Sequence, residues 1–553
     1  MSNKEIANAF KELGNLMELH QENPFKIRSY NNAYITLRKL GEPLADMPME
    51  DIKQIKGVGA AIADKIGQLL ETGTMSTLEK YREQTPEGVR EMLGIKGFGP
   101  KKVWVVWKDL GVETVGELLY ACNENRLIEL KGFGKKTQDD LKAKLEYHLK
   151  SRDKFHYASL EQEALELVNA LRAKFEGARI ELVGEMRRRC NVVKQIEVLI
   201  GTKVDASKLF EEGFLTEKEA FENGWSATSA KETPVQIYTC EAGDFGSKEF
   251  RYSATGEFMD AWVKAFPGKD FKNLQEEHQV FETAGIPYLE PELREEDYFL
   301  EMAIKGKVPD LVEEENILGV VHNHTTYSDG LHSLEEMAKY VQSNGFQYFV
   351  VTDHSKSAFY ANGLKEDRLH QQWAEIDALN QKMKDFTIFK GIESDILNDG
   401  SLDYDDSILA QFDCIIASVH SNLNMDEEKA TQRILKAVEN PYTHILGHPT
   451  GRLLLSRKGY PLDHKKIIDA CAANGVAIEL NAHPWRLDLD WTWIPYAMEK
   501  GVPISIDPDA HSKEGIHDIH FGVLSARKGG LTNEACLNTR SAEDFGKFLK
   551  SKK

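Results

Sequence analysis

The chain has 553 residues, and because a single hydrophobic core stops growing near roughly 250 to 300 residues, we expect several domains. Its composition, 41% hydrophobic and 29% charged, is typical of globular proteins, and no apolar run approaches the roughly 20 residues that cross a bilayer, so no membrane partner is expected. The six cysteines are far apart and form no CxxC pair, which argues against a disulfide framework or a thiolate zinc site and favours the cytoplasm.

The net charge of -20 is unevenly distributed. Residues 1–154 hold 25 Lys plus Arg against 23 Asp plus Glu, so the acidity lies almost wholly beyond them. An average over several domains can hide a local basic surface. The charge therefore does not exclude a polyanionic partner.

Residues 1 to about 150 are expected to be all-α, because segments such as IANAFKELGNLMELH carry apolar residues at helical spacing. The pattern apolar-Lys-Gly-x-Gly occurs three times there, each time before a predicted helix. Such a turn exposes backbone N–H groups beside a helix N-terminus, so the repeat predicts binding of DNA phosphates, although a plain connecting turn is the alternative. The predicted contacts are Lys56, Gly57, Gly59, Lys96, Gly97, Gly99, Lys101, Lys131, Gly132, Gly134 and Lys135.

From about residue 155 the pattern changes to a helix followed by the strands RIELVGE, IEVLIGT and VQIYTC, which predicts a small α/β domain. After a charged connector, seven short apolar strands alternate with helices to the end of the chain. This alternation predicts a parallel barrel.

Side chains able to bind metals follow the predicted barrel strands, where barrel enzymes keep their active sites. Imidazole and carboxylate together suit Zn²⁺, Mn²⁺ or Fe²⁺. The nine candidate ligands are His322, His324, Asp329, His354, Glu393, His420, His448, Asp509 and His511.

In the order of these parts the chain resembles a bacterial family X DNA polymerase with a C-terminal PHP (polymerase and histidinol phosphatase) domain. The resemblance implies a helix-hairpin-helix N-terminal region, a nucleotidyltransferase-like α/β palm with a small thumb, and a distorted (β/α)7 PHP barrel. The implied boundaries are 1–80 for a DNA-binding domain, 81–153 for fingers, 154–258 for the palm, 259–312 for thumb and linker, and 313–553 for the PHP domain.

The resemblance also implies how the ligands divide between two or three ions, with Mn²⁺ or Zn²⁺ expected. His322, His324, Glu393 and Asp509 would surround one ion, Glu393, His420 and His448 a second, and Asp329, His354 and His511 a third. Asp353 is expected to orient a ligand histidine. Many PHP domains have Asp two positions before the first motif histidine, where this chain has Val320. Arg486 is a candidate phosphate contact, or else an ion-pair partner of Asp488 or Asp490.

The palm departs from the family pattern. Gln195 and Glu197 stand where two Asp residues are expected on one strand, and Gln236 where a third is expected on the next. A neutral amide neither supplies charge nor bridges two cations well, so we expect Mg²⁺ binding and nucleotidyl transfer to be lost or very weak. The alternative is a divergent palm in which Asp244 or Glu249 substitutes.

Lys65 stands where some family members carry a Schiff-base lysine that removes a 5′ deoxyribose phosphate, although phosphate binding or plain solvation would also explain it. The preferred hypothesis is a monomeric DNA-repair nuclease, a 3′–5′ exonuclease that also acts at abasic sites, on gapped, nicked or primer-template DNA near the nucleoid. An active gap-filling polymerase with an associated nuclease, a silent DNA-binding scaffold and a small-phosphomonoester hydrolase are the alternatives.

Overall fold

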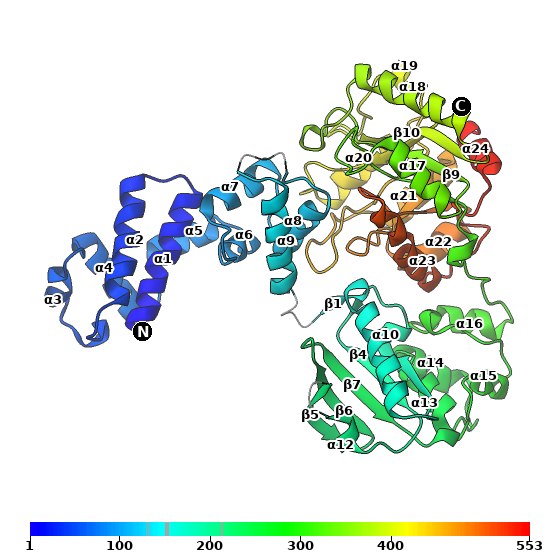
Figure 1. Ribbon diagram of the computed structural model, residues 1–553, viewed down its shortest axis with the longest axis horizontal. Helices are drawn as coiled ribbons and strands as arrows, with labels where there is room; N and C mark the ends of the chain where they lie inside the picture. Colours follow the sequence, from blue (N-terminus) through cyan, green and yellow to red (C-terminus); the bar gives the residue numbers. More distant parts are fainter. Residues whose placement is uncertain (129, 131, 150–153, 212–213, 553) are drawn as a thin grey trace. The chain divides into compact units, whose positions relative to one another are not determined.

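The computed structural model describes residues 1–128, 130, 132–149, 154–211 and 214–552, and it divides into two compact units, residues 1–151 and 152–553 (Figure 1). The described residues of the first unit form helices and turns without strands, as the helical spacing predicts. Its helices are α1 (Asn3–Leu19), α2 (Pro24–Arg38), α3 (Met49–Gln54), α4 (Ala60–Thr72), α5 (Ser76–Glu83), α6 (Glu87–Met92), α7 (Pro100–Asp109), α8 (Val115–Asn123) and α9 (Lys135–Leu149).

Local chemistry fixes where the helices of the first unit begin. The side chains of Ser2 and Glu5 exchange hydrogen bonds with each other's backbone N–H groups at the start of α1. Thr114 and Glu117 do the same at α8. Helices α4 and α7 instead begin at glycines of the predicted hairpins, Gly59 and Gly99, which have the same backbone angles, φ -81° and ψ 171°. The repeat seen in the sequence is therefore a repeated geometry.

The second unit opens with a mixed five-stranded sheet in the order β2-β4-β7-β6-β5, in which β4 and β7 are parallel. The hairpin β5–β6 was not predicted, because six of the seven residues of β5 are exposed and give no apolar alternation. The strands of this sheet are β2 (Ile180–Val183), β4 (Ile196–Ile200), β5 (Leu215–Phe221), β6 (Gly224–Ser229) and β7 (Pro234–Thr239), and a separate antiparallel pair is formed by β1 (Phe155–His156) and β3 (Val192–Val193).

Helices cover this sheet and lead to a small aromatic-rich core in which Phe250, Trp262 and Phe281 pack against one another. The helices are α10 (Tyr157–Lys174), α11 (Gly184–Arg187), α12 (Ala206–Leu209), α13 (Phe245–Tyr252), α14 (Gly256–Ala265), α15 (His278–Ala284) and α16 (Tyr298–Ile304). These parts lie where the resemblance expects a palm and a thumb, and those names are kept for them below.

Seven parallel strands in sequence order, β8 to β14, then form the expected barrel (Figure 1). A backbone bridge between Asn323 and Ala510, with His324 N donating to Ala510 O, joins the first strand's end to the last. The strands are β8 (Gly319–Val320), β9 (Tyr348–Val351), β10 (Thr387–Asp395), β11 (Cys414–Ser418), β12 (Ile445–Leu446), β13 (Ala477–Asn481) and β14 (Ile504–Asp507).

The barrel strands are buried almost throughout, as parallel strands covered by helices must be. The helices are α17 (Leu334–Ser343), α18 (Glu366–Lys382), α19 (Asp406–Leu409), α20 (Glu427–Val438), α21 (His464–Asn474), α22 (Ile494–Glu499), α23 (Ile519–Lys528) and α24 (Ala542–Lys550). The finer division of the chain into five domains stays a prediction.

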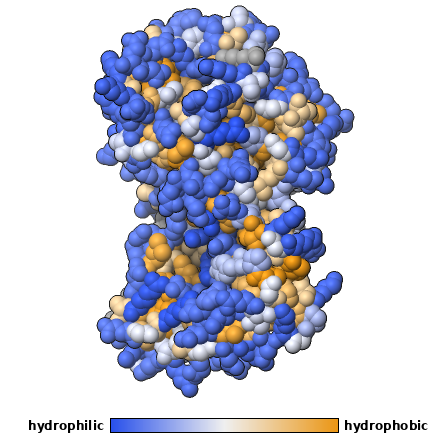
Figure 2. Space-filling model, turned by 90° about the vertical axis from the view of Figure 1, so that its right-hand side faces the viewer, coloured by the Kyte–Doolittle hydropathy of each residue, from blue (hydrophilic) through white to orange (hydrophobic). Residues whose placement is uncertain are grey.

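No helix among the described residues is long and apolar enough to cross a membrane. The face shown in Figure 2 is mostly hydrophilic, with apolar side chains in separate patches.

Candidate metal centre

The nine predicted ligands meet at the carboxyl ends of the barrel strands. Eight of them lie in a strand or within four residues beyond one, as with Glu393 inside β10 and His420 two residues after β11, and Asp329 lies nine residues after β8. Their side chains are between 0% and 7% exposed. The barrel therefore gathers into one buried cluster residues that span almost 200 positions of sequence.

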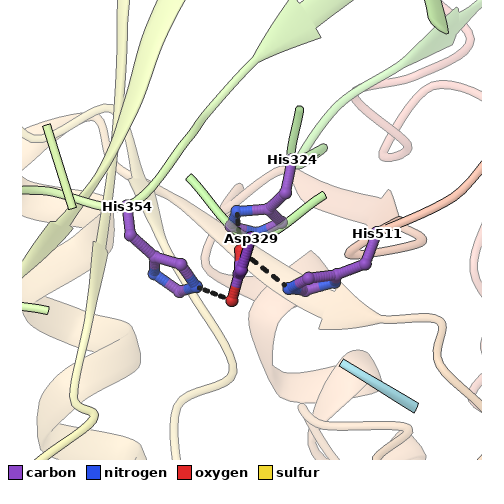
Figure 3. A group of neighbouring side chains, drawn as sticks. All are labelled: His324, Asp329, His354 and His511. Atoms are coloured by element: carbon purple, nitrogen blue, oxygen red, sulfur yellow. Dashed lines mark ion pairs between the residues drawn. The ribbon is translucent and has the colours of Figure 1, made fainter. Parts of the chain in front are cut away.

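One group in the cluster surrounds Asp329 (Figure 3). Asp329 Oδ2 lies 3.6 Å from His354 Nε2, and Oδ1 lies 3.5 Å from His511 Nε2. His324 Nδ1 is 3.8 Å from the same Oδ1. The predicted trio of Asp329, His354 and His511 thus comes together, with His324 as a fourth member.

Glu393 lies between the groups. Its Oε1 is 3.0 Å from Nε2 of both His420 and His448. The same oxygen is 3.2 Å from His322 Nε2, and Oε2 is 2.9 Å from His354 Nδ1. A carboxylate placed in this way can bridge two ions, which is the position expected for Glu393.

A further group joins His322, His324 and Asp509. Asp509 Oδ1 lies 3.0 Å from His324 Nε2 and 3.5 Å from His322 Nε2. Because His324 faces Asp329 through Nδ1 and Asp509 through Nε2, it belongs to two groups, where one was expected.

The donor set fits divalent cations. Several cluster atoms are buried without a hydrogen-bond partner among the described residues, among them His322 Nε2, Asp329 Oδ2 and Glu393 Oε2. Burial favours the neutral carboxyl, but the neighbouring histidines, His420 foremost, hold the pKa of Glu393 well below its usual range. Burial lowers the pKa of His324 to about 3, so its imidazole is neutral. Burial also opposes the charged forms of His322 and His354, but the neighbouring carboxylates raise the pKa of both rings well above 6.5, so these two rings must lose a proton to bind a metal. Ionised carboxylates and neutral imidazoles are the forms that bind metals.

Two carboxylates outside the predicted set contact predicted ligand histidines. Glu479 in β13 lies 2.5 Å from His322 Nδ1, and Asp395 at the end of β10 lies 2.5 Å from His420 Nδ1. Such contacts fix the tautomer and the ring orientation. Many PHP domains have Asp at the position of Val320, and in this chain Glu479 supplies a carboxylate partner for His322 instead. A lone acid inside the apolar segment VAIELNA is the signal that could have identified it, because a buried charge needs a partner.

Asp507 lies behind the same histidine, in a group with His322 and Glu479. Burial and the nearby Glu479 raise the pKa of Asp507 to about 8. Its Oδ1 accepts a hydrogen bond from Ser505 Oγ at 2.6 Å. With this pKa the Asp507 carboxyl is neutral near pH 7 and adds no negative charge for a cation. We therefore interpret Asp507 and Glu479 as residues that position His322 and do not hold an ion of their own.

Asp353 differs from its expected role, because its hydrogen-bond donors are not ligand histidines. It accepts from Thr325 N and Oγ1, both at 2.7 Å, from Ser328 N and Oγ, and from Gln372 Nε2. These contacts order the turn that leads to Asp329. Thr325 and Ser328 belong to the turn after β8, and Gln372 belongs to α18.

Arg486 lies beside the cluster, with its Nε 3.9 Å from Asp509 Oδ2. Asp490, one of its two alternative partners, forms an ion pair with Arg452. Asp488, the other, accepts hydrogen bonds from Thr450 N and Oγ1 at 3.0 Å. The position of Arg486 is compatible with the predicted phosphate contact, which stays a prediction.

In the palm, Glu197 and Gln236 are register neighbours on β4 and β7, and Gln195 immediately precedes β4. Glu197 accepts hydrogen bonds from Tyr238 Oη at 3.1 Å and Glu185 N at 3.3 Å, and burial raises its pKa. Among the described residues, the groups of three or more side chains close enough to share an ion all lie in the barrel.

The palm arginines Arg187 and Arg188 form ion pairs with nearby glutamates. Arg187 lies 2.7 Å from Glu277 and 3.2 Å from Glu249, and Arg188 Nε lies 2.9 Å from Glu295. Glu249, one of the acids considered as a substitute ligand, therefore faces a guanidinium, and burial raises its pKa to about 7. Asp244, the other, lies 3.7 Å from Lys248.

The three hairpins share one backbone shape. Their first glycines, Gly57, Gly97 and Gly132, have φ values of 92°, 84° and 89°. A Cβ at Gly59, Gly99 or Gly134 would meet nothing within 4 Å, so these backbones lie open. The lysines Lys56, Lys96, Lys101 and Lys135 are exposed, whereas Lys131 lies outside the described residues.

Lys65 lies in α4, half-buried, with its Nζ 6.0 Å from the centre of the Tyr30 ring. The cation–π contact with Tyr30 can account for the position of Lys65 without a catalytic role. The lyase role stays a prediction.

Comparison with known proteins follows this division of the chain. Three family models match: a helix-hairpin-helix domain over residues 1–75, a SAM-like helix-hairpin-helix tandem over 89–146, and the PHP domain over 321–483. Over 42% of its length, the chain is 29% identical to a probable phosphatase of Thermoanaerobacter sp. (strain X514), covering 94% of that protein. It is also 28% identical to a probable phosphatase of Acetivibrio thermocellus, covering 95% of that protein.

A longer match spans the whole chain. The chain is 34% identical over 573 residues to the DNA polymerase/3'-5' exonuclease PolX of Bacillus subtilis (strain 168), and the match covers 100% of both proteins. Both helix-hairpin-helix matches and the PHP match lie within it, and together they imply a DNA-binding protein with a metal-dependent domain. The chain belongs to the bacterial family X DNA polymerases that carry a C-terminal PHP domain.

Proposed function

We propose that this protein is a metal-dependent DNA phosphodiesterase of DNA repair, a 3′–5′ exonuclease that also cleaves at abasic sites. The observation that carries the proposal is the buried cluster of nine ligand side chains around Glu393 and Asp329. When bound, two or three ions of Mn²⁺ or Zn²⁺ would supply Lewis acidity and neutralise charge that develops on phosphate oxygens.

The chain's own residues would hold and position the reactants. Glu393 and Asp329 would hold the ions, Glu479 and Asp395 fix the rings of His322 and His420, and the hairpins would bind the DNA backbone. Arg486 would contact a phosphate from outside the ions, since a guanidinium pairs well with phosphate oxygens. A cytoplasmic, nucleoid-associated monomer acting on gapped, nicked or primer-template DNA completes the proposal.

The same proposal holds that the palm no longer transfers nucleotides. In its support, one acid of the expected three is present, Glu197, and it already accepts two hydrogen bonds. Two-metal phosphoryl transfer needs several anionic oxygens. The alternative of an active gap-filling polymerase is favoured by family membership, and primer extension on gapped DNA with Mg²⁺ and with Mn²⁺ decides between them. Robust extension that Glu197→Ala abolishes would overturn the proposal for the palm.

The nuclease proposal is tested on labelled primer-template, gapped and abasic DNA with Mn²⁺. The parent chain is compared with His354→Ala and Glu393→Ala. Cleavage by the parent and its loss in both variants is expected. Equal activity in all three chains would assign the cleavage to another site or to a contaminant and would sink the proposal.

A further inference from the structure

An exposed aromatic ring stands on a short turn beside the metal cluster. Phe359 is 81% exposed, and it follows the ligand His354 by five residues. Its ring contacts Tyr360, at a centroid distance of 5.9 Å, and Tyr360 contacts His354 at 6.3 Å. Two successive ring contacts thus connect the exposed phenyl group to a metal ligand.

The turn is anchored at both ends to the cluster. Ser355 N donates to Glu393 O at 3.0 Å, and Leu364 N donates to His354 O at 2.9 Å. Gly363 lets the turn close, because a Cβ there would lie 1.9 Å from Ser355 O. The position of Phe359 relative to the cluster is therefore set by backbone contacts to two of the ligands.

Hydrogen bonds of Ser357 also hold the middle of this turn. Ser357 N donates to Asp403 Oδ2 and Ser357 Oγ donates to Asp395 Oδ2, both at 2.6 Å. Asp395 in turn holds His420. Burying an apolar ring against a substrate lowers the free energy, and a turn that is already ordered loses little conformational entropy when its ring makes that contact.

The substrate chemistry follows from the burial of the ligands. Because the ligand side chains are at most 7% exposed, a phosphodiester reaches them more readily from an unpaired strand than from within a stacked duplex. Unpaired bases bind by stacking on aromatic side chains, and this contact tolerates any sequence. We propose that Phe359 stacks on an unpaired base at a single-stranded or frayed 3′ end and so selects such ends over intact duplex.

This inference rests on the proposed nuclease function, and its test separates the two. Cleavage with Mn²⁺ is measured for the parent, Phe359→Ala and Phe359→Trp on a single strand, on a blunt duplex, and on a single strand whose 3′-terminal nucleotides lack bases. Tyr298→Ala removes another exposed aromatic, 48% exposed in α16, as the control.

Phe359→Ala is expected to raise KM for the ordinary single strand roughly tenfold, with kcat changed less than about twofold, because a stacking contact is lost. Phe359→Trp and Tyr298→Ala keep the parent KM. On the base-free strand the parent and Phe359→Ala are expected to be equal. Equal KM values on the ordinary strand, or the same loss on the base-free strand, would overturn the inference.

A second measurement does not depend on cleavage. In a Glu393→Ala background, binding of a strand with 2-aminopurine at its 3′ end is expected to change the fluorescence of that base, and Phe359→Ala removes the change. A parent that fails to cleave any DNA refutes the nuclease function alone if this fluorescence change persists. Cleavage without any dependence on Phe359 in either measurement refutes the stacking alone.

Discussion

In the barrel, Glu393 lies 2.9 to 3.2 Å from four histidines and keeps one oxygen without a hydrogen-bond partner among the described residues. In the palm, Glu197 accepts hydrogen bonds from Tyr238 and Glu185 N, and the neighbouring arginines contact Glu277, Glu249 and Glu295. The barrel thus has buried atoms that lack hydrogen-bond partners and can bind a cation. In the palm, by contrast, the acids and arginines form ion pairs with one another.

The difference shows how a site is recognised physically. Charged residues are common in both regions, so their number decides nothing. Buried polar atoms are nearly always hydrogen-bonded, and a set that is not points to an ion or a substrate. A buried network in which each charge has a partner stabilises the fold instead.

The largest effect is expected from Glu393→Ala, which removes the carboxylate shared by the groups of the cluster. Mn²⁺-dependent DNA cleavage should fall roughly 10³-fold or more. When residues act as one unit, removing a single member costs about as much activity as removing all of them. Glu427→Ala, an exposed acid in the first turn of α20, is the matched control and should retain parent activity. Gel-resolved cleavage rates check this, and an unchanged rate would place the chemistry outside the barrel.

Glu277→Gln should destabilise the palm and thumb by about 3 to 5 kcal/mol, because it leaves buried Arg294 without its counter-charge. Glu277 lies 2.6 Å from Arg294, which is 0% exposed, and 2.7 Å from Arg187. Urea unfolding measures the change, with Glu166→Gln in the exposed Lys231 pair as a control expected to lose less than about 1 kcal/mol. A small effect would mean that the palm charges are not structural.

Glu479→Gln should weaken Mn²⁺ binding by roughly 10- to 100-fold, because His322 loses the carboxylate that orients it. Asp395→Asn should act similarly through His420. Asp377→Asn, which alters an exposed ion pair with Lys390, should leave the affinity unchanged. Calorimetric titration with Mn²⁺ measures all three, and parent-like affinity of Glu479→Gln would show that Glu479 is not needed to orient His322.

The smallest effect is expected where the palm meets the barrel. His520 lies 2.9 Å from Glu161 and 3.0 Å from Glu314, and hydrogen bonds to these acids, Glu161 first, raise its pKa to about 8. Because the folded pKa exceeds the unfolded value of about 6.5, this stabilisation is complete below that pH and is lost as pH rises through about 8.

The contribution is about 1 kcal/mol, since the imidazole is partly exposed and water screens the pair. Unfolding midpoints of the parent and His520→Gln should therefore differ at pH 6 and coincide at pH 9. A difference that is the same at both pH values would contradict the electrostatic origin.

Much of the fold could be predicted because local signals determine it. The apolar segments from ILGVVHNH to VPISID became seven parallel strands, and the three Gly-x-Gly turns share one backbone geometry. The polar hairpin β5–β6 gave no such signal, since its first strand is exposed at six of seven positions. Patterns that depend on burial fail where burial is slight.

For the site, the sequence by itself determined which side chains follow which strands, because the alternation of strand and helix places all strand ends at one edge. Only the tertiary structure decided the pairings: Glu479 with His322 across 157 positions, Asp353 with the turn before Asp329, and Arg187 with Glu277. Hydrogen-bond partners far apart in sequence depend on how distant elements pack together in the folded protein, and the local sequence around one partner does not identify the other.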